Sequence, residues 1–470
     1  MAKGYLPYDI NQRLLLPPDM RDWLPEGHLA LFISDVVDQL DLSKILAFYE
    51  AKDDRGRAGY HPAMLVKLLV YAYCVGKPSS RKIERATYED LAFRVLSGDQ
   101  HPDHDSIAAF RQRHLAALGE LFAQVLKLCQ KAGLVKLGHI AIDGTKFGAN
   151  ASKHKAMSYE RMGETEKKLE EEIGRLLAEA QRIDEEEDAR LGKGQRGDEL
   201  PDELARRESR LRKIQQAKAE LEAEARAKAE TQAAEAKAKL EERARKEAES
   251  GKKLGGRPPA VADPEQAKPD PKAQKNFTDP ESRIMPDGAN KGAFIQGYNA
   301  QIGVDAEAQI IVAADVNQQS NDKQQLVPMA EKIIEHVGRL ADTTSADSGY
   351  FSEQAVTDPR LKETNVLVPP DRQKHGPRDS EPAEPAVQPA STIERMRQKL
   401  RSEQGRALYK MRKAIVEPVF GQIKGVRGLR RFLLRGLDKV RDEFKLIAMT
   451  HNLLKLFRHG RVARALPTPA

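Results

Sequence analysis

Two acidic residues in this chain directly follow short segments with the composition of buried strands. Asp143 follows the apolar run from His139 to Ile142, and Asp347 follows the strand predicted in DTTSA. A carboxylate at the end of a buried strand costs free energy unless an opposite charge lies nearby. Because Gly144 comes next, a simple strand-ending turn is the alternative explanation for Asp143.

A third acid, Glu417, lies in RKAIVEPVFGQIKG, where a helix is predicted to begin with Pro418 in its first turn. Neighbouring strands would bring Asp143 and Asp347 together, although roughly 200 residues separate them. Three converging carboxylates repel one another unless divalent cations lie between them, and Mg²⁺ prefers oxygen ligands. Two such ions about 3.5–4 Å apart support phosphoryl transfer. The acids therefore predict a site for two Mg²⁺ ions, with Mn²⁺ as a substitute.

The elements that would position these acids form a mixed α/β sheet domain. Its predicted parts are the strand before Asp143, a hairpin over 294–316, a helix, two short strands and closing helices. Asp315 also lies near a strand end, but we assign it to a turn. Asp322 is expected to be a helix cap.

Residues 1–137 are predicted to be helical throughout. Gly98 and Gly133 are placed to end two of the helices. Short helices joined by tight turns are typical of helix-turn-helix DNA-binding domains. In such a domain Arg111 and Arg113 would lie near the start of the later helix and contact DNA. An ordinary helical bundle with surface arginines is the alternative.

A long antiparallel helical hairpin, of coiled-coil type, is predicted over 158–250. Apolar residues recur with heptad spacing on both sides of a break at LGKGQRGDELPDE. The positions concerned are Met162, Leu169, Ile173, Leu176, Ala180, Ile183, Leu204, Leu211, Ile214, Leu221 and Ala225. We interpret the hairpin as a structural or partner-binding arm. Residues 251–275 are predicted to be a flexible linker, and the Pro-rich residues 371–392 a disordered loop.

Positive charge is concentrated after Ser391. From there to Ala470 there are 20 Lys and Arg against 6 Asp and Glu, a net charge of +14, whereas the whole chain carries +7. This asymmetry indicates a polyanionic partner, although a solvated basic surface without a partner is the alternative. The two cysteines lack metal-ligand spacing, and no apolar run is long enough to span a bilayer. We therefore expect a protein of the cytosol without a membrane association.

Several segments together resemble the DDE transposases of bacterial insertion sequences, in the branch with a helical insertion. The segments are YHPAMLVKLLVYAYCVG, SSRKIERATYEDLAFRVLSGDQHPDHDSIAAFR, AIDGTKFGANAS, GYNAQIGVDAEAQIIVAADV, ADSGYFSE and VEPVFGQIKGVRGLRRFLLRGL. The resemblance implies an all-α DNA-binding domain over 1–137. It further implies an RNase H-like catalytic domain over 138–157 and 276–470, interrupted by the hairpin. It assigns Asp143, Asp347 and Glu417 as the metal-binding triad.

Related transposases also carry a Tyr, Arg, Glu, Lys signature around the last acid. Tyr409, Arg412, Glu417 and Lys424 nearly match it. The gap between Arg412 and Glu417 is one residue longer than usual, so Lys413 is an alternative to Arg412. Phosphate contacts are expected from Lys424 and from a following set of arginines, namely Arg427, Arg430, Arg431 and Arg435.

The expected function is a transposase of the bacterial cytosol and nucleoid. It would bind the terminal repeats of its element, cut the DNA and join it to a target, with two copies pairing the ends. A DNA-binding protein that has lost catalysis and a metal-dependent nuclease without strand transfer are the alternatives. The intact acids argue against the first, and the helical N-terminal domain argues against the second.

Overall fold

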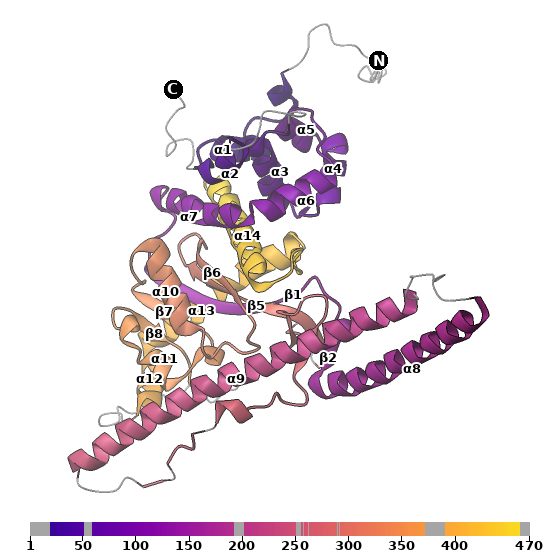
Figure 1. The fold of residues 1–470 in the computed structure, drawn as a ribbon. Coiled ribbons are helices and arrows are strands. Elements are labelled where there is room, and N and C mark those ends of the chain that lie inside the picture. The colour runs from indigo at the N-terminus through magenta and orange to yellow at the C-terminus, as the bar shows by residue number, and fades with distance from the viewer. Residues whose placement is uncertain are drawn as a thin grey trace, which may run out of the picture. The chain divides into compact units, whose positions relative to one another are not determined.

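The fold was analysed in a computed structural model (Figure 1), which describes residues 19–50, 59–191, 202–250, 255–256, 258–261, 263–288, 290, 292–371 and 391–460. Contacts within the chain define two compact units. Unit 1 combines Met1–Gly148 with Tyr298–Ala470, and unit 2 is Ala149–Gly297. The predicted disordered loop lies almost entirely outside the described residues. Among the described helices, none combines the length and apolar composition that crossing a bilayer requires.

The N-terminal part of unit 1 is helical, as predicted. Its elements are η1 Met20–Trp23, α1 Leu29–Val37, α2 Ser43–Glu50, α3 Pro62–Cys74, α4 Ser80–Glu89, α5 Leu91–Ser97, α6 His104–Arg113 and α7 Leu115–Lys131. Gly98 ends α5 in the left-handed conformation, with its N–H bonded to carbonyls of the last turn. Pro62 occupies the first turn of α3, where its missing N–H is not needed.

The rest of unit 1 contains the main sheet and its helices. Its strands are β1 His139–Gly148, β5 Phe294–Asp305 from Tyr298 onward, β6 Ile311–Asn317, β7 Thr343–Ser345 and β8 Asn365–Leu367. Its helices are α10 Leu326–Val337, η4 Ser348–Tyr350, α11 Glu353–Val356, η5 Pro359–Leu361, α12 Thr392–Arg401, α13 Glu403–Phe420, the π-helix η7 Gly421–Val426 and α14 Leu437–Arg458.

The sheet has six strands in the order β4-β5-β1-β7-β8, where β4 is Arg283–Pro286, and β6 also pairs with β5 outside this path. β1 pairs in parallel with β7, with Ala141 opposite Ser345, and β7 pairs in parallel with β8. β5 and β6 form the predicted antiparallel hairpin. The residues before Asp143 are fully buried, which explains why β1 can be the central strand of the sheet.

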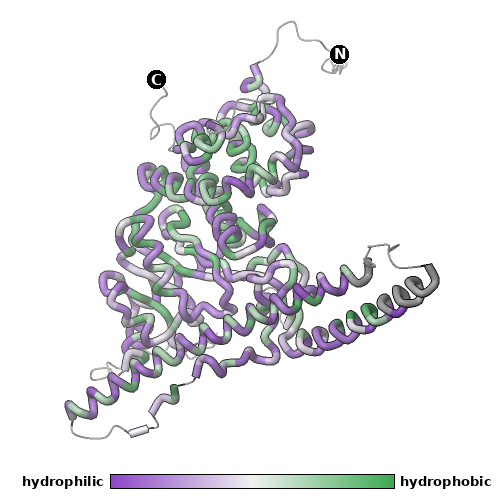
Figure 2. Tube along the Cα trace, viewed as in Figure 1, coloured by the Kyte–Doolittle hydropathy of each residue, from purple (hydrophilic) through white to green (hydrophobic). Residues whose placement is uncertain are grey.

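Helix α14 joins the sheet to the N-terminal helices within unit 1, because it packs against β6, α3 and α7. The Asn452 side chain of α14 donates to the carbonyl of Ile311 and accepts from its N–H. Both backbone polar groups of Ile311, in the outer strand β6, thus have hydrogen-bond partners from the helix. The α14 residue Glu443 is 1% exposed and accepts a 3.0 Å hydrogen bond from the Tyr73 hydroxyl of α3. Figure 2 shows hydrophobic residues in α3 and α14, whereas α9 is hydrophilic over much of its length.

Unit 2 contains two long helices and short strands. The elements are η2 Lys153–Lys155, β2 Ala156–Ser158, α8 Tyr159–Leu191, α9 Asp202–Ser250, η3 Pro264–Gln266, β3 Gln274–Asn276 and β4 Arg283–Pro286. β2 and β3 pair antiparallel, and β4 pairs with the first residues of β5. The predicted flexible linker over 251–275 is therefore wrong for its last part, because a backbone ladder fixes residues 274–275.

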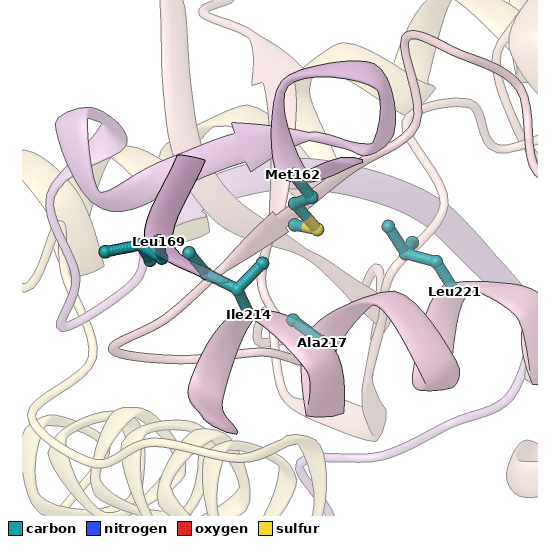
Figure 3. Close-up of a cluster of buried hydrophobic side chains, with 5 residues drawn as sticks. All are labelled: Met162, Leu169, Ile214, Ala217 and Leu221. Carbon is teal, nitrogen blue, oxygen red and sulfur yellow. The ribbon is translucent and has the colours of Figure 1, made fainter. Parts of the chain in front are cut away.

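Helices α8 and α9 run in opposite directions along each other. Ion pairs join Glu166 to Lys218 and Glu172 to Arg207. A residue later in α8 therefore contacts a residue earlier in α9, as antiparallel helices require. Between them lies an apolar cluster of Met162, Leu169, Ile214, Ala217 and Leu221 (Figure 3). Four of these five were predicted as heptad positions. The predicted positions Ala180, Ile183 and Leu204 have side chains outside the described part of the chain.

The two compact units divide the chain differently from the predicted domains. The helices before residue 137 share unit 1 with the sheet, whereas the predicted boundary would separate them. Residues 149–157 and 276–297, assigned to the catalytic domain from sequence, belong with α8 and α9 in unit 2. The physical reason for the first difference is α14, which follows the sheet in sequence yet packs on α3 and α7.

Candidate active site

Asp143 lies within β1 and not at its end, which corrects the prediction of a strand-ending acid. The strand continues to Gly148, so Asp143 and Gly144 do not form a turn. A Cβ atom on Gly144 would lie 2.8 Å from Oδ1 of Asp322 and closer still to the amide nitrogen of Gln301. Glycine is therefore required here because two other side chains occupy the space beside the strand.

Asp347 follows the C-terminal end of β7 and is the N-cap of η4. Its Oδ1 accepts a 2.8 Å hydrogen bond from the N–H of Gly349. Because β7 lies beside β1, Asp347 comes close enough to Asp143 for its charge to raise the pKa of the Asp143 carboxyl. The structure thus brings together two of the three predicted acids.

Both carboxyl groups have raised pKa values, and burial is the main cause in each case. The pKa of Asp143 rises to about 6, because burial and the charges of Asp347 and Asp322 outweigh the opposing effect of Arg412. Burial also raises the pKa of Asp347, against the effects of the Gly349 N–H and of Arg412. Acids that are hard to ionise in the empty protein are typical of sites built to bind cations or protons.

Arg412, on α13, is the basic partner of Asp143. Its Nη1 lies 3.2 Å from Oδ2 of Asp143, and the residue is 7% exposed. Its guanidinium lies 5.9 Å from the centroid of the Tyr409 ring. Lys413, the alternative in the predicted signature, is exposed. The structure therefore favours Arg412 for the position beside the acids.

Glu417, the third predicted acid, lies on α13. It is exposed, and its carboxylate makes no hydrogen bond or ion pair with another described residue. Five residues along an α-helix correspond to a rotation of roughly 140°, so Glu417 and Arg412 face different directions. The prediction that Glu417 begins a helix is also wrong, because α13 starts at Glu403 and contains Pro418 near its end.

A long-range contact explains why Pro418 is tolerated inside α13. Proline cannot donate to the carbonyl four residues earlier, which here belongs to Ala414. The side-chain amide of Gln309 donates to that carbonyl at 2.9 Å. After Pro418 the chain continues into the π-helix η7, which carries Lys424.

Lys424 is attached to β1 beyond Asp143. Its Nζ donates to Oγ1 of Thr145 at 2.6 Å and to the carbonyl of Lys146 at 2.7 Å. The same nitrogen lies 4.7 Å from the centroid of the Phe147 ring. In this structure Lys424 therefore fixes η7 against the strand that carries Asp143.

Two arginines predicted to contact DNA are buried. Arg427 is 5% exposed and donates from Nη1 to Oγ1 of Thr450 at 2.8 Å. Arg111 is 6% exposed and donates to the carbonyl of Pro78 at 2.7 Å. Both guanidinium groups are enclosed in this structure and bond to neighbouring residues, which gives these arginines a packing role here.

The other predicted arginines lie at the surface. Arg430, Arg431 and Arg435 are exposed and follow η7. The backbone around Arg431 pairs with the end of β1, because the Gly148 N–H donates to the Arg430 carbonyl at 3.0 Å. Arg113 is exposed in the N-terminal helices, with its guanidinium 4.7 Å from the centroid of the Phe48 ring.

Sequence reasoning missed a polar network beside the two acids. It consists of Lys146, Asn299, Gln301, Asp322 and Tyr350. A signal was present in GYNAQIG, because Asn299 and Gln301 are amides two residues apart in a predicted strand and so lie on one face of it. Polar residues repeated on one buried face indicate a polar partner across the sheet.

The donor set only partly suits the predicted metal ions. Asp143 and Asp347 offer carboxylate oxygens, the ligands that Mg²⁺ prefers, on neighbouring elements. Among the described residues, no group of three His, Cys, Asp or Glu side chains is arranged to hold a metal ion. Asp143 and Asp347 therefore offer the kind of ligand that the ion prefers, and in the described part of the chain no third ligand completes a group with them.

Comparison with known proteins identifies two families in the chain. Residues 18–113 match the family described as Transposase domain (DUF772), and residues 265–453 match the family described as Transposase DDE domain. The second match includes Asp347, Arg412 and Glu417. No curated protein and no solved structure matches the chain.

Proposed function

Because this chain belongs to the DDE transposases of insertion-sequence type, we propose that it cleaves and joins the ends of its element at the site around Asp143 and Asp347. DNA is the partner that the family implies. The observation that carries the proposal is the close approach of these two carboxylates from β1 and the end of β7, with raised pKa values in shared surroundings. Few structural roles would require two acids to approach each other in this way.

The sheet supports an RNase H-like catalytic fold as part of this proposal. In this sheet the β5–β6 hairpin lies on one side of β1, and the parallel strands β7 and β8 lie on the other. The first acid lies on the central strand, and the second follows its parallel neighbour. In this interpretation α8 and α9 form an insertion between the first and second strands of the sheet.

The residues of the chain would divide the catalytic work between them. Bound divalent cations, Mg²⁺ or Mn²⁺, would supply activation of the attacking oxygen and stabilisation of the leaving oxygen. Asp143 and Asp347 would hold the ions. Arg412 orients the carboxylate of Asp143 through the 3.2 Å contact. Glu417 is retained as the third ligand on its sequence motif alone, and its position in the structure does not support that role.

DNA binding would involve surfaces beside this site. Arg430, Arg431 and Arg435 follow η7 and are exposed, so they can contact phosphates without specifying sequence. Tyr409, Lys413 and Lys424 lie on the same α13–η7 segment. Arg113 remains the candidate contact among the N-terminal helices, which would bind the element ends. Two copies would act together when both ends are paired.

The test is a paired assay of end binding and end cleavage. Asp143→Asn and Asp347→Asn keep the side-chain shape but remove an anionic ligand, so each should nearly abolish cleavage and strand transfer in Mg²⁺. Binding of the element ends, measured by gel shift, should survive. Glu417→Gln tests the motif assignment. If Glu417 is the third metal ligand, this variant should lose cleavage as Asp143→Asn does, and if it is not, the variant should cut like the parent.

Asp315→Asn is the matched control, because Asp315 is 14% exposed at its side chain and ion-paired with Lys332 and Arg441. It should cut like the parent. If Asp143→Asn and Asp347→Asn both cut normally, the proposed site is wrong. Cleavage without any strand transfer by the parent would favour the nuclease alternative, and end binding without cleavage would favour a protein that has lost catalysis.

A further inference from the structure

Asp322 lies between the two segments that carry the catalytic acids. A Cβ on Gly144, the residue after Asp143, would lie 2.8 Å from its Oδ1. A Cβ on Gly349, two residues after Asp347, would lie 3.8 Å from its Oδ2. Gly144 therefore leaves room for the Asp322 carboxylate, and a Cβ on Gly349 would be at ordinary van der Waals distance from it, so Asp322 lies against both segments at once.

Two buried amides hold Oδ1 of Asp322. Asn299 donates from Nδ2 and Gln301 from Nε2, each at 2.6 Å. Both amide residues are fully buried, and Nζ of Lys146 lies 4.0 Å from the same oxygen. Hydrogen bonds to a charged acceptor are among the stronger ones in proteins, so the carboxylate has a fixed orientation.

The network continues from Gln301 to the segment of Asp347. The hydroxyl of Tyr350 donates to Oε1 of Gln301, and Tyr350 is fully buried. Tyr350 belongs to η4, the short helix that Asp347 caps. A continuous chain of contacts thus runs from η4 through Gln301 and Asp322 to the residues of β1 beside Asp143.

Helix capping does not account for Asp322. The N-cap of α10 is Gln325, three residues later, and it makes no side-chain capping bond. The side chain of Asp322 is only 20% exposed. A carboxylate enclosed to this extent beside two other acids costs free energy, and the amides around it offset that cost without explaining why an acid is present.

We propose that Asp322 is a positioning residue that sets the spacing of the Asp143 and Asp347 carboxylates, and through it the affinity of the site for divalent cations. The proposal rests on the function proposed above. Asp322 anchors Gln301, and Gln301 anchors Tyr350, so the position of η4 relative to β1 depends on its charge. Residues that orient metal ligands in this manner change metal affinity or activity about 10–100-fold when they are replaced.

The experiment measures metal binding apart from catalysis. Asp322→Asn has nearly the same shape and keeps one oxygen that can accept from both Asn299 and Gln301, so it removes the negative charge and weakens these charge-assisted hydrogen bonds. Mn²⁺ binding to the full chain without DNA is titrated by electron paramagnetic resonance, and cleavage of end DNA is measured across Mg²⁺ concentrations. We expect Mn²⁺ affinity at least tenfold weaker, a similar rise in the Mg²⁺ concentration for half-maximal cleavage, and unchanged end binding.

Two further variants keep the result interpretable. Asp315→Asn removes another ion-paired aspartate of similar exposure and should retain parental Mn²⁺ affinity. Tyr350→Phe keeps the buried ring and removes only the hydroxyl that donates a hydrogen bond to Gln301. It should therefore also weaken Mn²⁺ binding, but by a smaller factor than Asp322→Asn. If Asp322→Asn does not fold, as judged by circular dichroism, Tyr350→Phe decides the question.

The outcomes separate the two proposals. Weaker Mn²⁺ binding by folded Asp322→Asn or by Tyr350→Phe supports the positioning role. Parental Mn²⁺ affinity in folded Asp322→Asn, or in Tyr350→Phe when the first variant is unfolded, overturns it. If the parent cleaves, Asp143→Asn does not, and Asp322→Asn behaves like the parent, only this inference fails. If the parent does not cleave and Asp143→Asn binds Mn²⁺ as the parent does, the proposed function itself fails.

Discussion

The carboxyl group of Asp143 combines two opposing influences. Burial and the neighbouring acids make ionisation unfavourable, whereas Arg412 favours it, and the pKa rises to about 6 as the net result. In an unfolded chain an aspartate ionises near pH 3.9. The folded protein therefore keeps the Asp143 proton over a range of pH in which the unfolded chain has lost it.

This difference predicts a pH-dependent stability in metal-free protein. Below pH about 4 the group is protonated in both states, and between about 4 and 6 only the unfolded chain gains stability by ionising. The parent should therefore lose unfolding free energy relative to Asp143→Asn as pH rises through this window. The relative loss should reach at most about 3 kcal/mol and level off above pH about 6. Urea unfolding at several pH values measures it.

Asp347→Asn provides a second comparison at the same scale. Burial raises the pKa of Asp347 too, so the difference between parent and variant should change with pH in the same direction. A difference that is constant with pH for both variants, or that changes in the opposite direction, would contradict the account of these acids as groups that resist ionisation.

At the scale of elements, the segment from η7 to the start of α14 separates buried from exposed arginines. Arg427 is enclosed and bonded to Thr450, and burial lowers its pKa to about 10. Arg430, Arg431 and Arg435 point from the same segment to the surface. One short basic stretch thus serves the interior at one position and, in our proposal, DNA at the others.

Replacing Arg430, Arg431 and Arg435 together by Ala should flatten the salt dependence of non-specific DNA binding. Each lost phosphate contact on duplex DNA reduces the slope of log K against log salt by about 0.9, so three contacts correspond to roughly 2–3 units. Fluorescence anisotropy with an unrelated duplex, measured between low and moderate KCl concentrations, gives the slope.

Arg427→Met is the control for this experiment. It removes one positive charge from the same segment but from a buried side chain, so the slope should equal that of the parent. An unchanged slope in the triple variant, or an equal loss in Arg427→Met, would show that exposure does not decide which arginines contact DNA.

At the scale of the whole molecule, unit 1 depends on contacts between distant parts of the sequence. Glu443 of α14 accepts hydrogen bonds from the Tyr73 hydroxyl and from the N–H groups of Leu433 and Leu434. Burial is the main cause of the raised pKa of Glu443. Without α3, this enclosed carboxylate would lose the hydrogen bond from Tyr73, and the surface of α14 that packs on α3 would face water.

Deleting residues 1–137 should therefore abolish cooperative folding of the remainder, whereas deleting the long helices should not. In the second variant Tyr159–Ala273 is replaced by a short Gly/Ser turn that joins β2 to β3, which already pair. Its thermal transition by circular dichroism should remain single and cooperative, because α8 and α9 pack on each other and lie in unit 2. A folded 138–470 fragment would show that the N-terminal helices are a separate domain after all.

The sequence predicted the elements well and their contacts less completely. That Asp143 and Asp347 are carried by neighbouring strands was expected from the sequence, whereas the parallel pairing of β1 with β7 was not. The choice between Arg412 and Lys413 could not be anticipated, because it depends on which face of α13 meets β1. Asp322 resembled a helix cap, since its actual partners Asn299 and Gln301 lie more than 20 residues earlier in the chain.

The position of Pro418 is a second case in which a local sequence pattern led to a wrong prediction. A proline usually marks a helix start, and Glu417 was placed accordingly. The helix instead continues through Pro418, because Gln309, about 100 residues earlier, supplies the hydrogen bond that the carbonyl of Ala414 would otherwise lack. A local pattern cannot reveal a compensation that only the tertiary structure provides.

The central position of β1 has a consequence for the way the chain is made. The strand leaves the ribosome early, yet its partner β7 follows roughly 200 residues later, and α14 comes later still. Pairing between such distant segments is slow, and apolar surface stays uncovered meanwhile. The growing chain thus holds its acid-bearing strand without a partner until β5 has been made, roughly 150 residues later, and the sheet lacks β7 and the cover of α14 for longer still.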